Sequence, residues 1–357
     1  MKETTMMQIA AIMAQTYGVE IEMNEITRSR AAELAADYFG THEFRDTHRT
    51  NGYRTWSAWD AKGREWKFSY DSSIRGPEDE KCEMVTPILK YEDIELLQGL
   101  LRMLRKNGAK SSPSRGCGVH IHVGLKGLDG RDHNAQSLRN LVNIMAAHES
   151  QIGRAIRIDA GRTGRYCRTI DPNFLAQVNK QKPTTMEALA DIWYSSQGCN
   201  YGRTQHYNES RYHMLNLHPG MAYTLGSRDH AKPTVEFRLF QFANPYTTEK
   251  GEKRQGGLHA GEIKAYIQLC LGMSAFAKSL KTASPKPQQT DNEKFAMRTW
   301  LNRMGFIGDE FATAREILLR NLEGNTAWRA GARPQPAENE YTFETRYNPA
   351  PTERTAC

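Results

Sequence analysis

The stretch that decides the fold is Gly18-Val19-Glu20-Ile21-Glu22-Met23. Successive side chains of an extended strand point to opposite faces of the sheet. Glu20 and Glu22 therefore share one face, and the aliphatic residues between them share the other. The stretch predicts a strand with an apolar back for helices to cover and a charged front.

The same alternation occurs twice more along the chain. In the stretch Gly118-Val-His-Ile-His-Val the two histidines, His120 and His122, share a face. In the stretch Thr234-Val-Glu-Phe-Arg-Leu, Glu236 and Arg238 do the same. Each motif alone has an ordinary explanation: a solvent-facing strand, exposed imidazoles or an in-strand ion pair. Their joint occurrence, each with an apolar back, indicates a functional face, because so much charge is costly to bury unpaired.

Short segments rich in β-branched or aromatic residues predict six strands, over residues 17–23, 65–70, 82–87, 119–125, 213–217 and 234–240. Apolar residues at helical spacing predict helices over residues 93–106, 133–152, 258–276, 293–304 and 309–322. Thr184 and Glu187 have the spacing of a capping box at the start of a further helix. Strands and helices do not alternate strictly, and no glycine-rich loop follows a strand. This pattern favours an α+β fold over a doubly wound one.

The composition bounds the class of protein. The chain has 357 residues, a formal charge of +7 and six cysteines without a CxxC pair. Such thiols are typical of a reduced, cytoplasmic protein. No run approaches the ~18 apolar residues of a membrane span. The apolar start at residues 6–14 lacks the basic leader of a signal peptide.

The positive charge favours anionic partners, and arginines cluster between Arg154 and Arg168. A solvated basic surface is the plainer explanation. A nucleic-acid-binding protein is a further alternative and would lose affinity steeply with salt. The chain shows no helix-turn-helix or zinc finger, and the carboxylate-rich face would repel phosphate unless metals intervene. We therefore do not expect nucleic acid as a partner.

The charged face is suited to hard divalent cations. A site rich in oxygen ligands with one imidazole suits Mg²⁺ or Mn²⁺ better than Zn²⁺. Asp71 and Glu83 are further acids that can join it, and five acids with a histidine can hold two or three ions. Such an array is what a nucleoside triphosphate and its phosphoryl transfer require. The alternative is a zinc-dependent hydrolase that uses His120, His122 and one glutamate, but it leaves Arg238 without a role.

The order of motifs resembles the amidoligase family. The motifs are Gly18-Val-Glu-Ile-Glu, Asp71-Ser-Ser-Ile, Glu83-Met-Val-Thr-Pro, Gly118-Val-His-Ile-His-Val-Gly, Arg211-Tyr-His-Met-Leu-Asn and Thr234-Val-Glu-Phe-Arg-Leu-Phe. That family is a branch of the carboxylate–amine ligases related to glutamine synthetase and glutamate–cysteine ligase, and it is frequent in phage and other mobile elements. The similarity runs from about residue 17 to residue 245. Ser72 departs from it, since glycine is more usual there.

The resemblance implies a curved antiparallel, glutamine synthetase-like sheet with helices packed on its apolar face. It also implies roles for site residues. The metal ligands it implies are Glu20, Glu22, Asp71, Glu83, His120 and Glu236. The nucleotide-binding residues are His122, Arg162 and Asn216, and the catalytic residues are Arg238, Arg165 and Arg211.

The implied reaction uses ATP and Mg²⁺, or Mn²⁺, to form an amide through an acyl phosphate. The partners would be a small-molecule or peptide carboxylate and an amine, and an oligomer is compatible with the family. The base that deprotonates the amine is not identified, although Glu209 and Asp159 are acids outside the metal set. Cys117 and Cys167 lie near the motifs and allow a thioester route, but small apolar packing is the simpler role. A ligase fold that has lost activity is disfavoured by the complete set of charged residues.

The domain organisation follows from composition. We expect an amidoligase catalytic domain over residues 1–280 and a linker over residues 281–292, where the sequence KTASPKPQQ is rich in proline and polar residues. A C-terminal helical segment is expected over residues 293–323. An extended or disordered tail, poor in aliphatic residues, is expected over residues 324–357.

Overall fold

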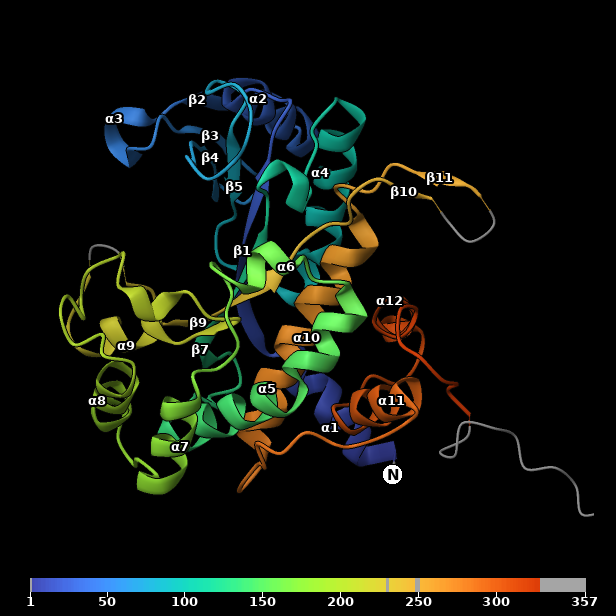
Figure 1. The fold of residues 1–357 in the computed structure, drawn as a ribbon. Helices are drawn as coiled ribbons and strands as arrows, with labels where there is room; N and C mark the ends of the chain where they lie inside the picture. The colour runs from blue at the N-terminus through green and yellow to red at the C-terminus, as the bar shows by residue number, and fades with distance from the viewer. Residues whose placement is uncertain (1, 229–230, 248–250, 328–357) are drawn as a thin grey trace, which may run out of the picture.

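The computed structural model describes residues 2–228, 231–247 and 251–327, and its centre is a curved sheet of nine strands (Figure 1). The strand order is β2-β3-β4-β5-β1-β7-β9-β8, with β6 paired to β1, and every pairing between these strands is antiparallel. The strands are β1 (Gln15–Met23), β2 (Phe44–Asp46), β3 (Trp56–Trp59), β4 (Glu65–Ser69), β5 (Cys82–Val85), β6 (Leu89–Lys90), β7 (Val119–Gly127), β8 (Leu215–Asn216) and β9 (Thr234–Phe240). A separate hairpin pairs β10 (Tyr246–Thr247) with β11 (Lys253–Arg254).

The predicted α+β class and all six predicted strands are confirmed. The sequence did not predict β2 and β3, because β2 is three exposed residues and β3 is only four residues long. Both extend the sheet beyond β4 through antiparallel pairing. The sheet therefore reaches further on the β1–β5 side than the motifs alone indicate.

Helices cover the apolar back of the sheet (Figure 1). The long helix α10 (Ala260–Ser279) packs on β1 and β7, and α2 (Arg28–Phe39) packs on β3 and β4. Between them α4 (Ile94–Lys106) contacts both α2 and α10, while α5 (Ala135–Ile156) lies along α10. The strand residues that face these helices, such as Ile21, Ile121 and Phe237, are fully buried. Each such side chain contributes about 1.5–3 kcal/mol relative to exposure.

The remaining helices flank this core. They are α1 (Lys2–Met13), α3 (His48–Asn51), α6 (Ala160–Thr163), α7 (Pro172–Gln181), α8 (Met186–Ser196), α9 (His218–Thr224), α11 (Glu293–Arg303) and α12 (Ala312–Leu319). The predicted capping box at Thr184 is wrong. The N-cap of α8 is Thr185, whose hydroxyl accepts from the backbone N–H of Ala188, because the helix begins one residue later. No helix among the described residues is both long and apolar enough to cross a membrane.

The C-terminal part returns to the same core. Residues 281–292 form no helix or strand, and the side chains of Asn140 and Asn143 on α5 hold this region by donating to the carbonyls of Leu280 and Ala283. Helix α12 then packs on α10 and α5, and α11 packs on α12. The predicted tail lies outside the described residues from residue 328 onward.

Glu149 makes stability depend on pH. Its carboxylate on α5 accepts a hydrogen bond from the backbone N–H of Ile170 at 2.9 Å, and burial raises its pKa from 4.5 to about 7. Because the folded pKa is raised, the stability linked to its protonation is complete below pH 4.5 and is lost as the pH rises through about 7. We expect the free energy of unfolding to fall over this window by up to about 3 kcal/mol.

This loss should vanish in Glu149→Gln, which keeps the acceptor but cannot ionise. Urea denaturation at pH 5, 6.5 and 8 measures it, and Glu95→Gln, at an exposed position on α4, is the control. An identical pH dependence in wild type and Glu149→Gln would contradict the assignment.

Candidate functional site

The antiparallel register brings the charged residues of three strands together. Glu20 of β1 lies opposite His120 of β7, and His122 of β7 lies opposite Glu236 of β9. Asn216 of β8 lies opposite Glu236 in turn, and its amide donates to Glu236 Oε2 at 2.6 Å. Because paired residues share a face, all five side chains project from the front of the sheet, opposite the helices.

A second acidic group forms where β5 joins the sheet. Glu83 of β5 lies opposite Glu22 of β1, and Asp71 follows the end of β4. The buried carboxylate of Glu22 accepts from the backbone N–H of Gly118 at 2.6 Å. Asp71 Oδ1 accepts from the backbone N–H of Ser73, also at 2.6 Å. Both acids are thus fixed in orientation.

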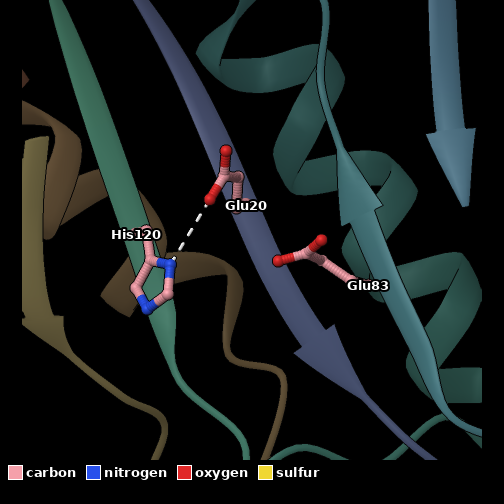
Figure 2. A group of neighbouring side chains, drawn as sticks. All are labelled: Glu20, Glu83 and His120. Atoms are coloured by element: carbon pink, nitrogen blue, oxygen red, sulfur yellow. Dashed lines mark hydrogen bonds and ion pairs between the residues drawn. The ribbon is translucent and has the colours of Figure 1, made fainter. Parts of the chain in front are cut away.

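Three overlapping groups on this face have ligand atoms within 4.8 Å of one another. They are Glu20 with Glu83 and His120, Glu20 with His122 and Glu236, and Glu22 with Asp71 and Glu83. Figure 2 shows the first group, whose three side chains converge from β1, β5 and β7. Together the groups contain every metal ligand predicted from the sequence. Among the described residues, none of these groups contains both histidines, which sets them apart from the two-histidine zinc site of the alternative.

The protein's own cations lie on the β9 side of this face. Arg238 Nη1 is 2.6 Å from Glu236 Oε1, and Lys232 Nζ is 3.1 Å from Glu20 Oε1. Lys232 was not predicted from the sequence, because it precedes β9 and the alternation of the strand does not extend to it. Its only signal is its place two residues before Thr234.

The pKa values divide the face into two halves. Burial opposes ionisation of Glu236, but the guanidinium of Arg238 holds its pKa well below the ordinary value. Burial likewise opposes ionisation of Glu20, but the ammonium of Lys232 and the imidazoles of β7 hold its pKa well below the ordinary value. For Glu83, burial and then the neighbouring carboxylates hold the pKa well above its ordinary value. The β5 half therefore has carboxylates without enough positive charge, which is what a divalent cation supplies.

Three buried side-chain nitrogen atoms near β9 make no hydrogen bond among the described residues, namely His122 Nε2, Arg162 Nε and Arg238 Nε. Of these, His122 Nε2 already lies 3.2 Å from Glu20 Oε1. The other ring nitrogen of His122, Nδ1, lies 3.1 Å from Thr234 Oγ1. Buried polar atoms are normally satisfied, so these nitrogens fit a site that receives an anionic ligand beside the acidic groups.

Arg162 and Asn216 contact the charged residues of β9 and belong to none of the three acidic groups. The Arg162 side chain packs on Gly118, where a Cβ would lie 2.2 Å from its Nη1, and its Nη2 donates to the carbonyl of Arg238 at 2.9 Å. Asn216 accepts from the backbone N–H of His218 at 2.8 Å in addition to its bond to Glu236. Both residues are thus placed to orient Arg238 and Glu236.

Arg165 and Arg211 belong to none of the acidic groups. Arg165 lines a cavity of about 340 Å³ whose other lining residues are Gly164, Tyr166, Arg168, Glu209 and Tyr212. The guanidinium of Arg211 lies 5.3 Å from the ring of Tyr207 and 5.9 Å from that of Tyr212. The Tyr212 ring is also 6.0 Å from Arg238, so this residue connects the cavity with the charged face.

Comparison with known protein families gives a match over most of the chain. The model of the family described as "putative amidoligase enzyme" matches residues 13–274. Among solved structures, a bifunctional glutathione synthetase from Pasteurella multocida is similar, with 12% identity, a TM-score of 0.43 and coverage of 89% of this chain. The chain spans about half of that protein, 49% of its length. No curated protein matches the chain.

Replacing Glu83 should weaken divalent-ion binding. We expect Glu83→Gln to raise the dissociation constant for Mn²⁺ on the order of 10–100-fold, since lost outer-shell partners alone cost that much. Titration followed by the electron paramagnetic resonance of free Mn²⁺ measures the constant. The matched control, Glu95→Gln, should bind as the wild type does. If Glu83→Gln binds Mn²⁺ as tightly as the wild type does, Glu83 is not a ligand. The melting temperature of the variant is measured as well, to show that it is folded.

Proposed function

The chain belongs to the amidoligase family, and from this premise we propose that it is an ATP-dependent ligase that joins a carboxylate to an amine. The observation that carries the proposal is that a cation-binding group of carboxylates and a buried guanidinium lie on the same face of the sheet. The Glu22–Asp71–Glu83 group suits cations, and the buried guanidinium of Arg238, whose Nε has no hydrogen-bond partner among the described residues, suits an anion. A metal-bound nucleoside triphosphate supplies both at once.

The donor set fits Mg²⁺ or Mn²⁺. Each group on the face offers carboxylates with at most one imidazole, which suits hard cations better than zinc. We propose that six residues of these groups hold the ions, namely Glu20, Glu22, Asp71, Glu83, His120 and Glu236. Bound there, Mg²⁺ neutralises phosphate charge and aligns the nucleotide with the substrate carboxylate.

The proposed reaction has two steps. An oxygen of the substrate carboxylate attacks the γ-phosphorus of ATP, so that an acyl phosphate forms and ADP leaves. The amine nitrogen then attacks the acyl carbon, phosphate leaves and a proton is released, which completes the amide. The chain contributes alignment and charge stabilisation more than covalent chemistry.

Arg238 is proposed to stabilise the charge of the transferring phosphoryl group. Its guanidinium is buried and donates to the carboxylate of Glu236, and Arg162 donates to the backbone carbonyl of Arg238. A guanidinium fixed in this way offers several donors to phosphate oxygens without reorganisation. His122, with Nδ1 next to the hydroxyl of Thr234, can donate from Nε2 to the same phosphates.

Trapping with hydroxylamine tests the first step without knowledge of the amine. Hydroxylamine converts an acyl phosphate to a hydroxamate, so wild type with Mg²⁺, ATP and pooled carboxylic acids should form hydroxamate and ADP in equal amounts. Arg238→Lys should slow this by on the order of 10²–10³-fold, since loss of one fixed donor to developing charge costs about that much. The control is Arg30→Lys, at an exposed position on α2.

Two results would contradict the proposed role of Arg238 or the ligase function. Equal hydroxamate formation by wild type and Arg238→Lys would remove Arg238 from the reaction. Amide hydrolysis without nucleotide, by a protein that retains stoichiometric zinc, would replace the ligase proposal with a hydrolase.

A further inference from the structure

The cavity beside Arg238 is walled by two loops that run side by side. The loop after α6 and the segment before β8 are joined by a bridge between Arg168 and His213. The backbone N–H of Arg168 donates to the carbonyl of Tyr212 at 3.0 Å, and that of Met214 donates to the carbonyl of Arg168 at 2.7 Å. The N–H of Arg238 donates in turn to the carbonyl of Met214 at 2.8 Å. This backbone ladder fixes the cavity next to the charged face.

Two opposite charges on the cavity wall remain unpaired. Neither the carboxylate of Glu209 nor the guanidinium of Arg165 makes a hydrogen bond or ion pair within the described part of the chain. The guanidinium of Arg165 lies over the ring of Tyr166, 5.0 Å from its centre. The side chain of Arg168 is already used, since it donates to the carbonyls of Tyr212 and Glu209 at 3.3 and 3.5 Å. The cavity thus presents one exposed carboxylate and one exposed guanidinium that have no ionic partner within the described residues.

We propose that this cavity is the subsite for the amine substrate, and that this amine also carries a carboxylate, as a free amino acid does. The ammonium group would face Glu209 and the carboxylate would face Arg165. This inference rests on the proposed ligase function. A volume of about 340 Å³ lies at the small end of the range for ligand pockets and admits a molecule of amino-acid size.

The position suits the second step of the reaction. The acyl carbon must lie next to the transferred phosphoryl group, and the amine must reach that carbon. Tyr212 forms part of the cavity wall and also lies 6.0 Å from Arg238, so a ligand in the cavity is adjacent to the phosphoryl site. Holding the two reactants side by side supplies much of the rate enhancement of such reactions.

A second cavity, of about 470 Å³, does not offer the same position. It is lined by Arg45 and Arg49 among others and lies at the β2 edge of the sheet. Cross-strand partners lead from Glu20 through Val85, Lys67 and Ser57 to Arg45. Four strand spacings of about 4.8 Å amount to about 19 Å, which is too far for a small amine to reach the acyl carbon.

The test is binding of amino acids, which requires neither nucleotide nor turnover. Wild type is titrated in a calorimeter with the twenty common amino acids, their amides, which lack the carboxylate, and their N-acetyl forms, which lack the ammonium. We expect at least one amino acid to bind more tightly than both derivatives. Arg165→Gln should abolish the preference over the amide, and Glu209→Gln should abolish the preference over the N-acetyl form. Each should weaken binding of the amino acid by about tenfold or more, as for the loss of a charge-assisted bond.

Two controls accompany the test. Arg49→Gln and Glu187→Gln change exposed residues of the same types outside the cavity and should leave both preferences intact. The inference is overturned if no amino acid binds wild type more tightly than its derivatives, or if neither cavity variant changes the preference. Failure of the ligase proposal is seen separately, as absence of hydroxamate from wild type in the trapping assay.

Discussion

The pairing of β1 with β7 is the contact on which the rest of the site depends. It places Glu20 opposite His120, and every other ligand group is positioned relative to these two through the next strand pairing. On the back of the same strands Ile21 and Ile121 are fully buried against the helices. The phase of a strand, meaning which of its residues point to the front and which to the back, sets both the packing of the core and the alignment of the charged face. The two are therefore a single constraint.

The charge on the front face is balanced unevenly, and this asymmetry organises the chemistry. On the β9 side, Arg238 and Lys232 offset the carboxylates of Glu236 and Glu20. On the β5 side, Glu83 forms no ion pair within the described residues. Burial and the neighbouring carboxylates hold its pKa above the ordinary value. One face thus has a half suited to metal ions and a half suited to phosphate, which is the polarity of a metal–nucleotide complex.

Alternation along strands predicted the fold class, the six strands and which side chains share the charged face. It did so because the side-chain period of a strand is fixed and local. The sequence did not predict features set by contacts between distant segments. Lys232 lies outside the strand whose residues it serves, and Arg162 packs against Gly118 through tertiary contact alone. The cavity is likewise invisible in the sequence, since its two loops meet only through the bridge between Arg168 and His213.

The strand phase separates the parts of this molecule that can change in length from those that cannot. Insertion of a single residue in β1 or β7 would turn carboxylates or imidazoles toward the helices and aliphatic groups toward the front of the sheet. The loops around Arg165 and Glu209 have no such phase, because they belong to no strand. Diversification within this fold is therefore free to lengthen or shorten the walls of the cavity while the strands keep their register. The shape and size of the cavity can thus change while the carboxylates and imidazoles of the charged face keep their positions.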